Sequence, residues 1–219
     1  MTDVGIYDGD LLVIDRSLKP KNFSTVVANV HDEFVEKLLK ATQAMKVGHG
    51  QEAGTQIGPV VSQQQLDENL AYVDLGISEG AELACGGQRL EMPTTGFYMS
   101  PGVFINTTND MRINREEMFA PLAAVIKVDS YDEALHVVND TNFGLTSGIV
   151  TRSLARATHF RRNARTGCVM VNLPTAGTDY HVPFGGRGDS SYGTREQGSY
   201  AAEFYTTVKT AYISSGTPE

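Results

Sequence analysis

Two adjacent acids stand in the segment Asn114-Arg-Glu-Glu-Met-Phe-Ala-Pro121, just before an apolar run. A carboxylate at this place can accept hydrogen bonds from the hydroxyls of a ligand, and Phe119 can pack against a flat ring. The other interpretation is a solvated pair of acids that enters a loop stopped by Pro121. Spacing alone favours this second interpretation, so the segment is a candidate binding site only if further residues support it.

A second candidate is the glycine-rich segment Pro183-Phe-Gly-Gly-Arg187. Glycine lets a ligand approach the backbone closely and tolerates positive φ. An ordinary tight turn explains the same residues equally well. We interpret the tripeptide Arg187-Gly-Asp189 as a coincidence and not as an adhesion motif.

The two cysteines, Cys85 and Cys168, have neither the spacing of metal ligands nor that of a disulfide framework. Both fall within or at the end of a predicted strand, so we expect small apolar side chains and not activated thiolates. The five histidines are scattered, and no metal site is expected. No Gly-x-Gly-x-x-Gly opens a strand-helix unit, so a dinucleotide fingerprint of that type is excluded.

The chain of 219 residues has 18 basic and 26 acidic side chains and a formal charge of −8. Because the basic residues form no stripe, nucleic acid is not an expected partner. The apolar run 120–126 is far shorter than the roughly 20 residues that cross a bilayer, and the acidic N-terminus does not resemble a signal peptide. We therefore expect a cytoplasmic protein that does not enter a membrane.

Helical and strand periods alternate along the chain, which predicts an α/β fold. Ser62 and Ser130 are the expected N-caps of two helices. Between 123 and 172 strands alternate with helices, which predicts a sheet with parallel crossovers. The expected strands are 10–15, 25–29, 82–85, 97–105, 123–128, 145–151 and 168–172, and the expected helices are 31–45, 62–79, 131–140 and 156–165.

The segment 174–198 is a long loop with many glycines, and long loops of compact domains are often functional. The following segment, 204–213, is rich in β-branched and aromatic residues and predicts a final strand. Such a strand has an exposed edge, so we expect it to contact a second subunit and to support a homo-oligomer.

From about residue 32 to residue 216 the sequence resembles the C-terminal part of aldehyde dehydrogenases. The stretch that begins at Thr175 looks most like members that act on acidic semialdehydes such as 2-oxoglutarate semialdehyde. The resemblance implies the C-terminal catalytic portion of that α/β fold, with 204–213 as an oligomerisation strand. It rests jointly on the segment 114–121 and on Met45-Lys-Val-Gly-His49, Gly58-Pro-Val-Val61, Cys85-Gly-Gly87, Asn142-Phe-Gly-Leu145, Val171-Asn-Leu173, Pro183-Phe-Gly-Gly186 and Phe204-Tyr-Thr-Thr-Val-Lys209.

This resemblance implies oxidation of a small aldehyde to a carboxylate, with NAD or NADP as the hydride acceptor. In the family a cysteine thiolate adds to the carbonyl, hydride leaves, and water activated by a glutamate releases the acid. By resemblance Glu117 holds the nicotinamide ribose and Phe119 lies beside the nicotinamide, although Ala120 stands where the family usually has glycine. Phe184, Thr178 and Asp179 are expected to border the substrate tunnel.

The family's nucleophilic cysteine, general-base glutamate, oxyanion asparagine and most of its dinucleotide-binding sheet lie upstream of the matching region. Neither Cys85 nor Cys168 matches the position of the nucleophile, so no catalytic residue is assigned. We therefore expect a truncated dehydrogenase that is inactive by itself. The alternative is a non-catalytic binding or assembly module, because an orphaned half-enzyme exposes apolar surface that promotes association.

The first 20 residues look like a fragment of a self-cleaving peptidase of the LexA/UmuD type, beginning just after the place of its serine nucleophile. Lys37 would fall near that family's lysine base, but without the serine the peptidase chemistry is absent. A remnant of a Ser/Lys autopeptidase is thus a third interpretation. We expect a peptidase-like fragment over 1–30 and the dehydrogenase region over 31–219, with the junction between about 21 and 40. A fused or truncated reading frame is the simplest account.

Overall fold

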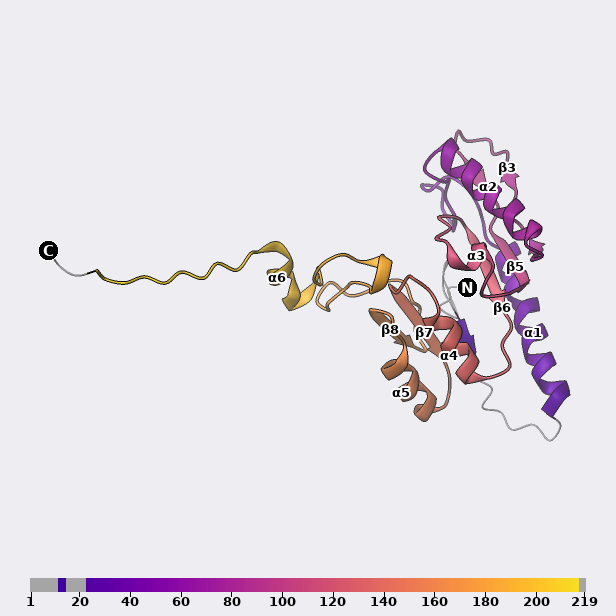
Figure 1. Cartoon of the computed structure of the whole chain (residues 1–219). Coiled ribbons are helices and arrows are strands. Elements are labelled where there is room, and N and C mark those ends of the chain that lie inside the picture. The colour runs from indigo at the N-terminus through magenta and orange to yellow at the C-terminus, as the bar shows by residue number, and fades with distance from the viewer. Residues whose placement is uncertain (1–11, 15–22, 217–219) are drawn as a thin grey trace.

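Two three-stranded sheets organise the chain in its computed structural model, which describes residues 12–14 and 23–216, with side chains from residue 31 onward. The first sheet has the strand order β2-β5-β6 and the second has the order β1-β7-β8. Figure 1 shows α1, α2 and α3 beside the first sheet, and α4 and α5 beside the second. Residues 206–216 extend away from both groups as a tail (Figure 1). The α/β class expected from the sequence is therefore confirmed.

The first group holds three helices, the first sheet and a two-stranded ribbon. Within its sheet, β2 is antiparallel and β6 is parallel to β5. Its elements are α1 (Phe23–Gln43), α2 (Gln63–Ser78), β2 (Glu82–Cys85), β3 (Arg89–Leu90), β4 (Tyr98–Met99), β5 (Gly102–Thr107), α3 (Arg112–Arg115) and β6 (Leu122–Ile126).

Helix α2 begins where the sequence predicts, because the Ser62 hydroxyl accepts a hydrogen bond from the Gln65 N–H (3.1 Å). One face of the helix packs on the first sheet through Leu66 and Val73. Gly76 lies on the same face, where a Cβ atom would come within 2.9 Å of the Phe104 ring. Its missing side chain is what lets the helix approach the sheet so closely.

The second group is a βαβ unit to which two further elements are added. Its strands β7 and β8 are parallel and are joined through α5, as the sequence predicts. The Ser130 hydroxyl caps α4 by accepting a hydrogen bond from the Glu133 N–H (3.1 Å). The elements are β1 (Leu12–Ile14), α4 (Tyr131–Asn139), β7 (Thr146–Val150), α5 (Leu154–Asn163) and β8 (Cys168–Val171).

Each group has its own hydrophobic core. The first core is built around Leu66 and Phe104, both with no exposed surface. The second is built around Phe160, which has no exposed surface, and Ile149. Since these two clusters share no buried residue, the groups are held together by other contacts.

Two predictions about the elements between residues 23 and 172 are wrong. Residues 25–29 lie within α1 and are not a strand, because a short apolar, β-branched run fits a helix as well as a strand and its period alone does not decide. Strands β6 and β7 belong to different sheets, so the alternation between 123 and 172 does not build one sheet. Periodicity identifies each element but carries no information about which strand pairs with which.

The strand expected over 204–213 is not formed within the chain. Helix α6 (Ala201–Tyr205) covers its beginning, and residues 206–216 have no regular structure and are exposed. A strand needs a hydrogen-bonded neighbour, and this segment lies away from both sheets (Figure 1). The expected long loop over 174–198 is confirmed, interrupted only by a 3₁₀ turn at Gly188–Ser190 (η1), and a second one, η2, follows at Gly198–Tyr200.

At the N-terminus, the strand expected over 10–15 is present as β1. Most of the proposed peptidase-like fragment falls on residues 1–11 and 15–22, outside the described residues, so that resemblance stays a prediction. None of the helices in the described part of the chain has both the length and the hydropathy to span a membrane.

We predict that Phe104→Ala lowers the free energy of unfolding by roughly 3–5 kcal/mol, because it removes a fully buried ring and leaves a cavity under α2. Urea denaturation followed by circular dichroism measures this change. The matched control is Val61→Ala, at a side chain that is 87% exposed, where the change should stay within about 0.5 kcal/mol. Equal effects of the two substitutions would show that the first core is not packed as described.

Candidate functional site

The acidic segment 114–121 connects α3 to β6, and side chains of α2 hold it. Helix α3 leads into this segment. At its start, the Glu79 carboxylate accepts hydrogen bonds from the N–H groups of Arg112 (2.9 Å) and Ile113 (3.4 Å). These N–H groups have no partner within so short a helix, so the carboxylate satisfies them. The end of α2 therefore fixes the start of α3.

Glu116, the first of the two acids, is anchored on both sides. It accepts hydrogen bonds from the Arg112 guanidinium (2.7 and 3.1 Å) and from the Tyr72 hydroxyl (3.0 Å). The Arg112 hydrogen bond is the main reason that the pKa of Glu116 lies below its ordinary value. Burial is the main reason that the pKa of Tyr72 is raised, and the hydrogen bond to Glu116 adds to it. Glu116 is therefore a structural acid.

The other end of the loop is held through a backbone carbonyl. The Gln65 side-chain amide donates to the Phe119 carbonyl (3.2 Å) and to the side-chain oxygen of buried Asn69 (2.8 Å). Both ends of the span 116–119 are thus tied to α2. Within the span, the Glu117 carboxylate is exposed and the Phe119 ring is 74% exposed. The structure therefore places the two predicted cofactor residues together, on one anchored loop and open to solvent.

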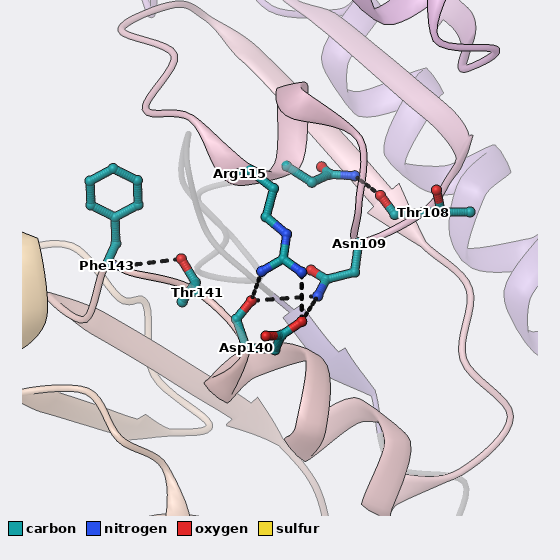
Figure 2. Close-up of polar contacts among 7 residues, drawn as sticks. Thr108, Asn109, Arg115, Asp140, Thr141 and Phe143 are labelled. Atoms are coloured by element: carbon teal, nitrogen blue, oxygen red, sulfur yellow. Dashed lines mark hydrogen bonds and ion pairs between the residues drawn. The ribbon is translucent and has the colours of Figure 1, made fainter.

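Arg115 ties this loop to the second group of elements, as Figure 2 shows. Its guanidinium donates to the Asp140 carboxylate (2.6 Å) and also to the Asp140 backbone carbonyl. The Asn109 amide donates to the same carboxylate (2.7 Å). Asp140 is the C-cap of α4, so a cation here also interacts favourably with the negative end of the helix.

The Arg115 contact explains the electrostatics of Asp140. The hydrogen bond from Arg115 is the largest cause that holds the pKa of Asp140 below its ordinary value of 3.8. Both side chains are partly exposed, which places the pair in the range where solvent screening weakens it. The ion pair therefore contributes little to the free energy of unfolding, and its main effect is to orient the loop relative to α4.

The residues after Asp140 carry the connection to the glycine-rich loop. The carbonyl of buried Gly144 accepts hydrogen bonds from the N–H groups of Gly167 and Arg187 (both 2.9 Å). In addition, the Asp189 N–H donates to the Asn142 carbonyl (2.9 Å). The segments 142–145 and 183–190 are therefore docked against each other at the start of β8. These hydrogen bonds favour the interpretation of 183–187 as part of a loop held by the rest of the fold over that of an isolated tight turn.

Gly167 shows how closely the glycine-rich loop approaches. A Cβ atom on Gly167 would lie 1.9 Å from the Gly185 carbonyl oxygen, so no other residue fits there without movement of the backbone. Gly185 itself has φ near +154°, next to the Arg195 side chain, which donates to the Gly186 carbonyl (2.9 Å). The loop is thus fixed from both sides.

The predicted substrate residues are less well defined. Phe184 is half-buried, and its carbonyl accepts a hydrogen bond from the Glu196 N–H (3.3 Å). Thr178 is half-buried and Asp179 is exposed. Among the described residues no hydrogen bond or ion pair joins these three to Glu117 or Phe119. The two predicted sets therefore lie on different segments, and the hydrogen bonds of Arg115 and Asn109 to Asp140 are among the contacts that link them.

Neither cysteine has the surroundings of a nucleophile. Cys85 ends β2 and is half-buried, and burial raises the pKa of its thiol. Cys168 begins β8, with its sulfur 3.9 Å from the Gly185 carbonyl oxygen. The residues described by the structure contain no cluster of His, Cys, Asp and Glu that could hold a metal ion.

Sequence reasoning missed the residues that position the loop. Arg112 and Glu116 are four apart, a spacing that could have suggested their pairing on one helical turn. Gln65 and Tyr72, by contrast, contact a segment far away in the sequence, and Arg115 contacts another helix. Nothing in the local pattern marks such partners.

The sequence matches the Aldehyde dehydrogenase family over residues 22–211. It is 40% identical over 190 residues to "Alpha-ketoglutaric semialdehyde dehydrogenase" of Bacillus subtilis, covering 86% of this chain and 39% of the relative. It is 38% identical to "Betaine aldehyde dehydrogenase" of Mesorhizobium japonicum, covering 87% of this chain and 39% of the relative. The chain thus spans about 39% of the length of these curated relatives.

Solved structures give the same result. The NAD+ complex of aldehyde dehydrogenase from Bacillus cereus is similar with a TM-score of 0.79 and 32% identity, covering 86% of this chain and 38% of that one. The Mycobacterium tuberculosis aldehyde dehydrogenase complexed with NAD+ has a TM-score of 0.78 and 32% identity, covering 87% of this chain and 39% of that one.

We predict that Asp140→Asn lowers the melting temperature by no more than about 2 °C near neutral pH, because it removes the charged partner of Arg115 from a partly exposed pair. The lowered pKa of Asp140 means that the carboxylate stabilises the fold above pH 3.8, and that this contribution is lost as the pH falls from 3.8 through the lower folded-state pKa. The difference between variant and parent should therefore shrink near pH 3. Calorimetry at both pH values measures it.

The matched control for this experiment is Asp74→Asn, an exposed acid on α2, whose melting temperature should follow that of the parent at both pH values. A loss for Asp140→Asn that is as large near pH 3 as at neutral pH would contradict an ionic origin.

Proposed function

Because the chain belongs to the aldehyde dehydrogenase family, we propose that it supplies the nicotinamide-binding loop and one wall of the aldehyde path of an NAD(P)-dependent aldehyde-oxidising site. The observation that carries this proposal is the anchored loop 116–119. Its ends are held by α2, while an acid and an aromatic ring between them face solvent. A loop fixed in this way loses little conformational entropy when a ligand binds.

The side chains of this loop fit the ribose and the base of a nicotinamide nucleotide. The Glu117 carboxylate has two acceptor oxygens, which suits two neighbouring ribose hydroxyls. The exposed Phe119 ring offers a flat apolar surface of the size of a nicotinamide ring. NAD or NADP would supply the hydride acceptor, and the relatives solved in complex with NAD+ support the first of these.

For the substrate, we propose a small acidic semialdehyde such as 2-oxoglutarate semialdehyde. Two relatives named as α-ketoglutarate semialdehyde dehydrogenases support it, one from Bacillus subtilis and one from Haloferax volcanii, at 40% and 42% identity. Phe184, Thr178 and Asp179 would border the path of the aldehyde, on the loop that is docked on 142–145. Phe184 is the best defined of the three, because its carbonyl accepts a hydrogen bond from the Glu196 N–H within this loop.

The attacking thiolate is not among these 219 residues. Cys85 and Cys168 are the only cysteines, and they lie in different sheets. The raised pKa of Cys85 disfavours its thiolate, and Cys168 is placed by β8 against the Gly185 carbonyl. We therefore propose that the chain binds nucleotide at most and does not oxidise an aldehyde by itself.

Subunit contact through 204–213 is a further part of the proposal, as is a cytoplasmic location. Exposed apolar side chains gather there, with Val208, Tyr212 and Ile213 all more than 90% exposed. An extended apolar segment of this kind can add as a strand to the edge of a sheet in a second copy. The same observation favours the alternative function, a non-catalytic assembly module.

The proposal predicts that the purified chain, mixed with NAD+ or NADP+ and 2-oxoglutarate semialdehyde, forms no reduced nucleotide by absorbance. It also predicts that NAD+ binds, and that Glu117→Gln weakens binding roughly tenfold, since the loss of about 1.4 kcal/mol corresponds to that factor. Titration followed by ligand-observed NMR measures the affinity.

Glu36→Gln, at an exposed acid of α1, is the control and should bind as the parent does. Robust turnover would overturn the assignment of the cysteines. Equal affinity of Glu117→Gln and the parent would overturn the role of the loop.

For subunit contact, we predict that Ile213→Asp shifts the chain toward the monomer, because a charge in an apolar strand contact is costly. Size-exclusion chromatography with light scattering measures the mass. Thr206→Asp, placed at the start of the segment, is expected to have a smaller effect. A parent that is already monomeric at high concentration would count against both the strand contact and the assembly module.

A further inference from the structure

Strand β7 depends on a neighbour that is distant in the sequence. On one side it pairs with β8, which follows it directly through α5. On the other side it pairs in parallel with β1, and the register places Leu12, Val13 and Ile14 opposite Gly148, Ile149 and Val150. In the described part of the chain, no other strand pairs with this side of β7.

Removal of β1 would destabilise β7, because this strand is buried. Ser147, Gly148 and Ile149 are buried, and Ile149 belongs to the second core. Without β1, the backbone N–H and C=O groups on that side of a buried strand would lose their partners. They would also form an open edge, which is a template for pairing with another chain.

Strand β1 lies outside the region that matches the family. The match covers residues 22–211, and so includes β7 and β8 but not Leu12–Ile14. A segment outside the family region therefore closes a sheet that belongs to it. Since strand pairing is recognised mainly through backbone hydrogen bonds, a segment of unrelated origin can take this place if it is short, extended and rich in aliphatic residues. The sequence Leu-Val-Ile meets these conditions.

We propose that the open side of β7 is a strand-acceptor site, and that the chain's own Leu12–Ile14 occupies it in cis as an edge-closing strand. In the structure the occupant comes from the same chain, where β1 also lies beside α4. Its role is to satisfy the backbone of β7 and to keep this edge from pairing with a second copy. This role is independent of nucleotide binding.

Two proline substitutions test the pairing. Successive N–H groups of a strand point to opposite sides, so only one of Leu12→Pro and Val13→Pro removes an N–H that faces β7. The other removes an N–H from the outer edge, where proline is tolerated. We expect one variant to lose amide protection in Gly148–Val150 by on the order of tenfold in hydrogen exchange, and the other to keep it.

Three comparisons make the result decisive. Amides of α2 report global folding and should be unchanged in both variants. Val208→Pro, in the exposed C-terminal segment, should leave Gly148–Val150 as in the parent. The variant that loses protection should form larger species by light scattering, since its β7 edge is open.

Equal behaviour of Leu12→Pro and Val13→Pro would overturn the proposal, whether both keep or both lose protection. Protection in the parent that rises with protein concentration would also overturn it, because the strand would then come from a second copy. These outcomes do not depend on nucleotide affinity, so they are distinguishable from a failure of the proposed function.

Discussion

The contact between Arg115 and Asp140 is the constraint on which the arrangement of the candidate site depends. Each half of the molecule has its own core, around Phe104 in one and Phe160 in the other, and the two clusters share no buried residue. Between the halves, the Arg115 and Asn109 side chains bind Asp140. A guanidinium is suited to this task, because its rigid fork of donors binds the carboxylate and the carbonyl of one residue together.

Two kinds of contact restrain the candidate site: those that shape the loop 116–119 and those that position it. Side chains of α2 hold the ends of the loop 116–119, and so they set the shape of the loop that carries Glu117. Arg115, immediately before this loop, sets its place relative to 142–145 and the glycine-rich loop. Because the Arg115 and Asp140 side chains are partly exposed, solvent screens them, and this second restraint is the softer one.

Local signals predicted the elements of this fold well, and long-range pairing escaped them for a physical reason. The caps at Ser62 and Ser130 follow from interactions within a few residues, which the sequence displays directly. The error at 25–29, which lies in α1, arose because a short apolar run fits a helix as well as a strand. The single sheet expected across β6 and β7 was wrong because the sequence does not display which strands pair. Family resemblance pointed to Glu117 and Phe119, but the residues that anchor their loop lie far away in the sequence on α2: Tyr72 binds Glu116 and Gln65 binds the Phe119 carbonyl.

The same distinction bears on the proposal that this part of the family fold binds nucleotide without oxidising an aldehyde by itself. Backbone pairing and core packing tolerate many sequences, so β7 can accept Leu12–Ile14 from outside the family region. Catalysis tolerates no such replacement, because it requires a particular thiol with a lowered pKa beside the reacting carbonyl, and burial moves the pKa of Cys85 the opposite way. Shape and chemistry therefore place different demands on the chain: a strand of almost any aliphatic composition closes the sheet, whereas the nucleophile must be one cysteine in one environment.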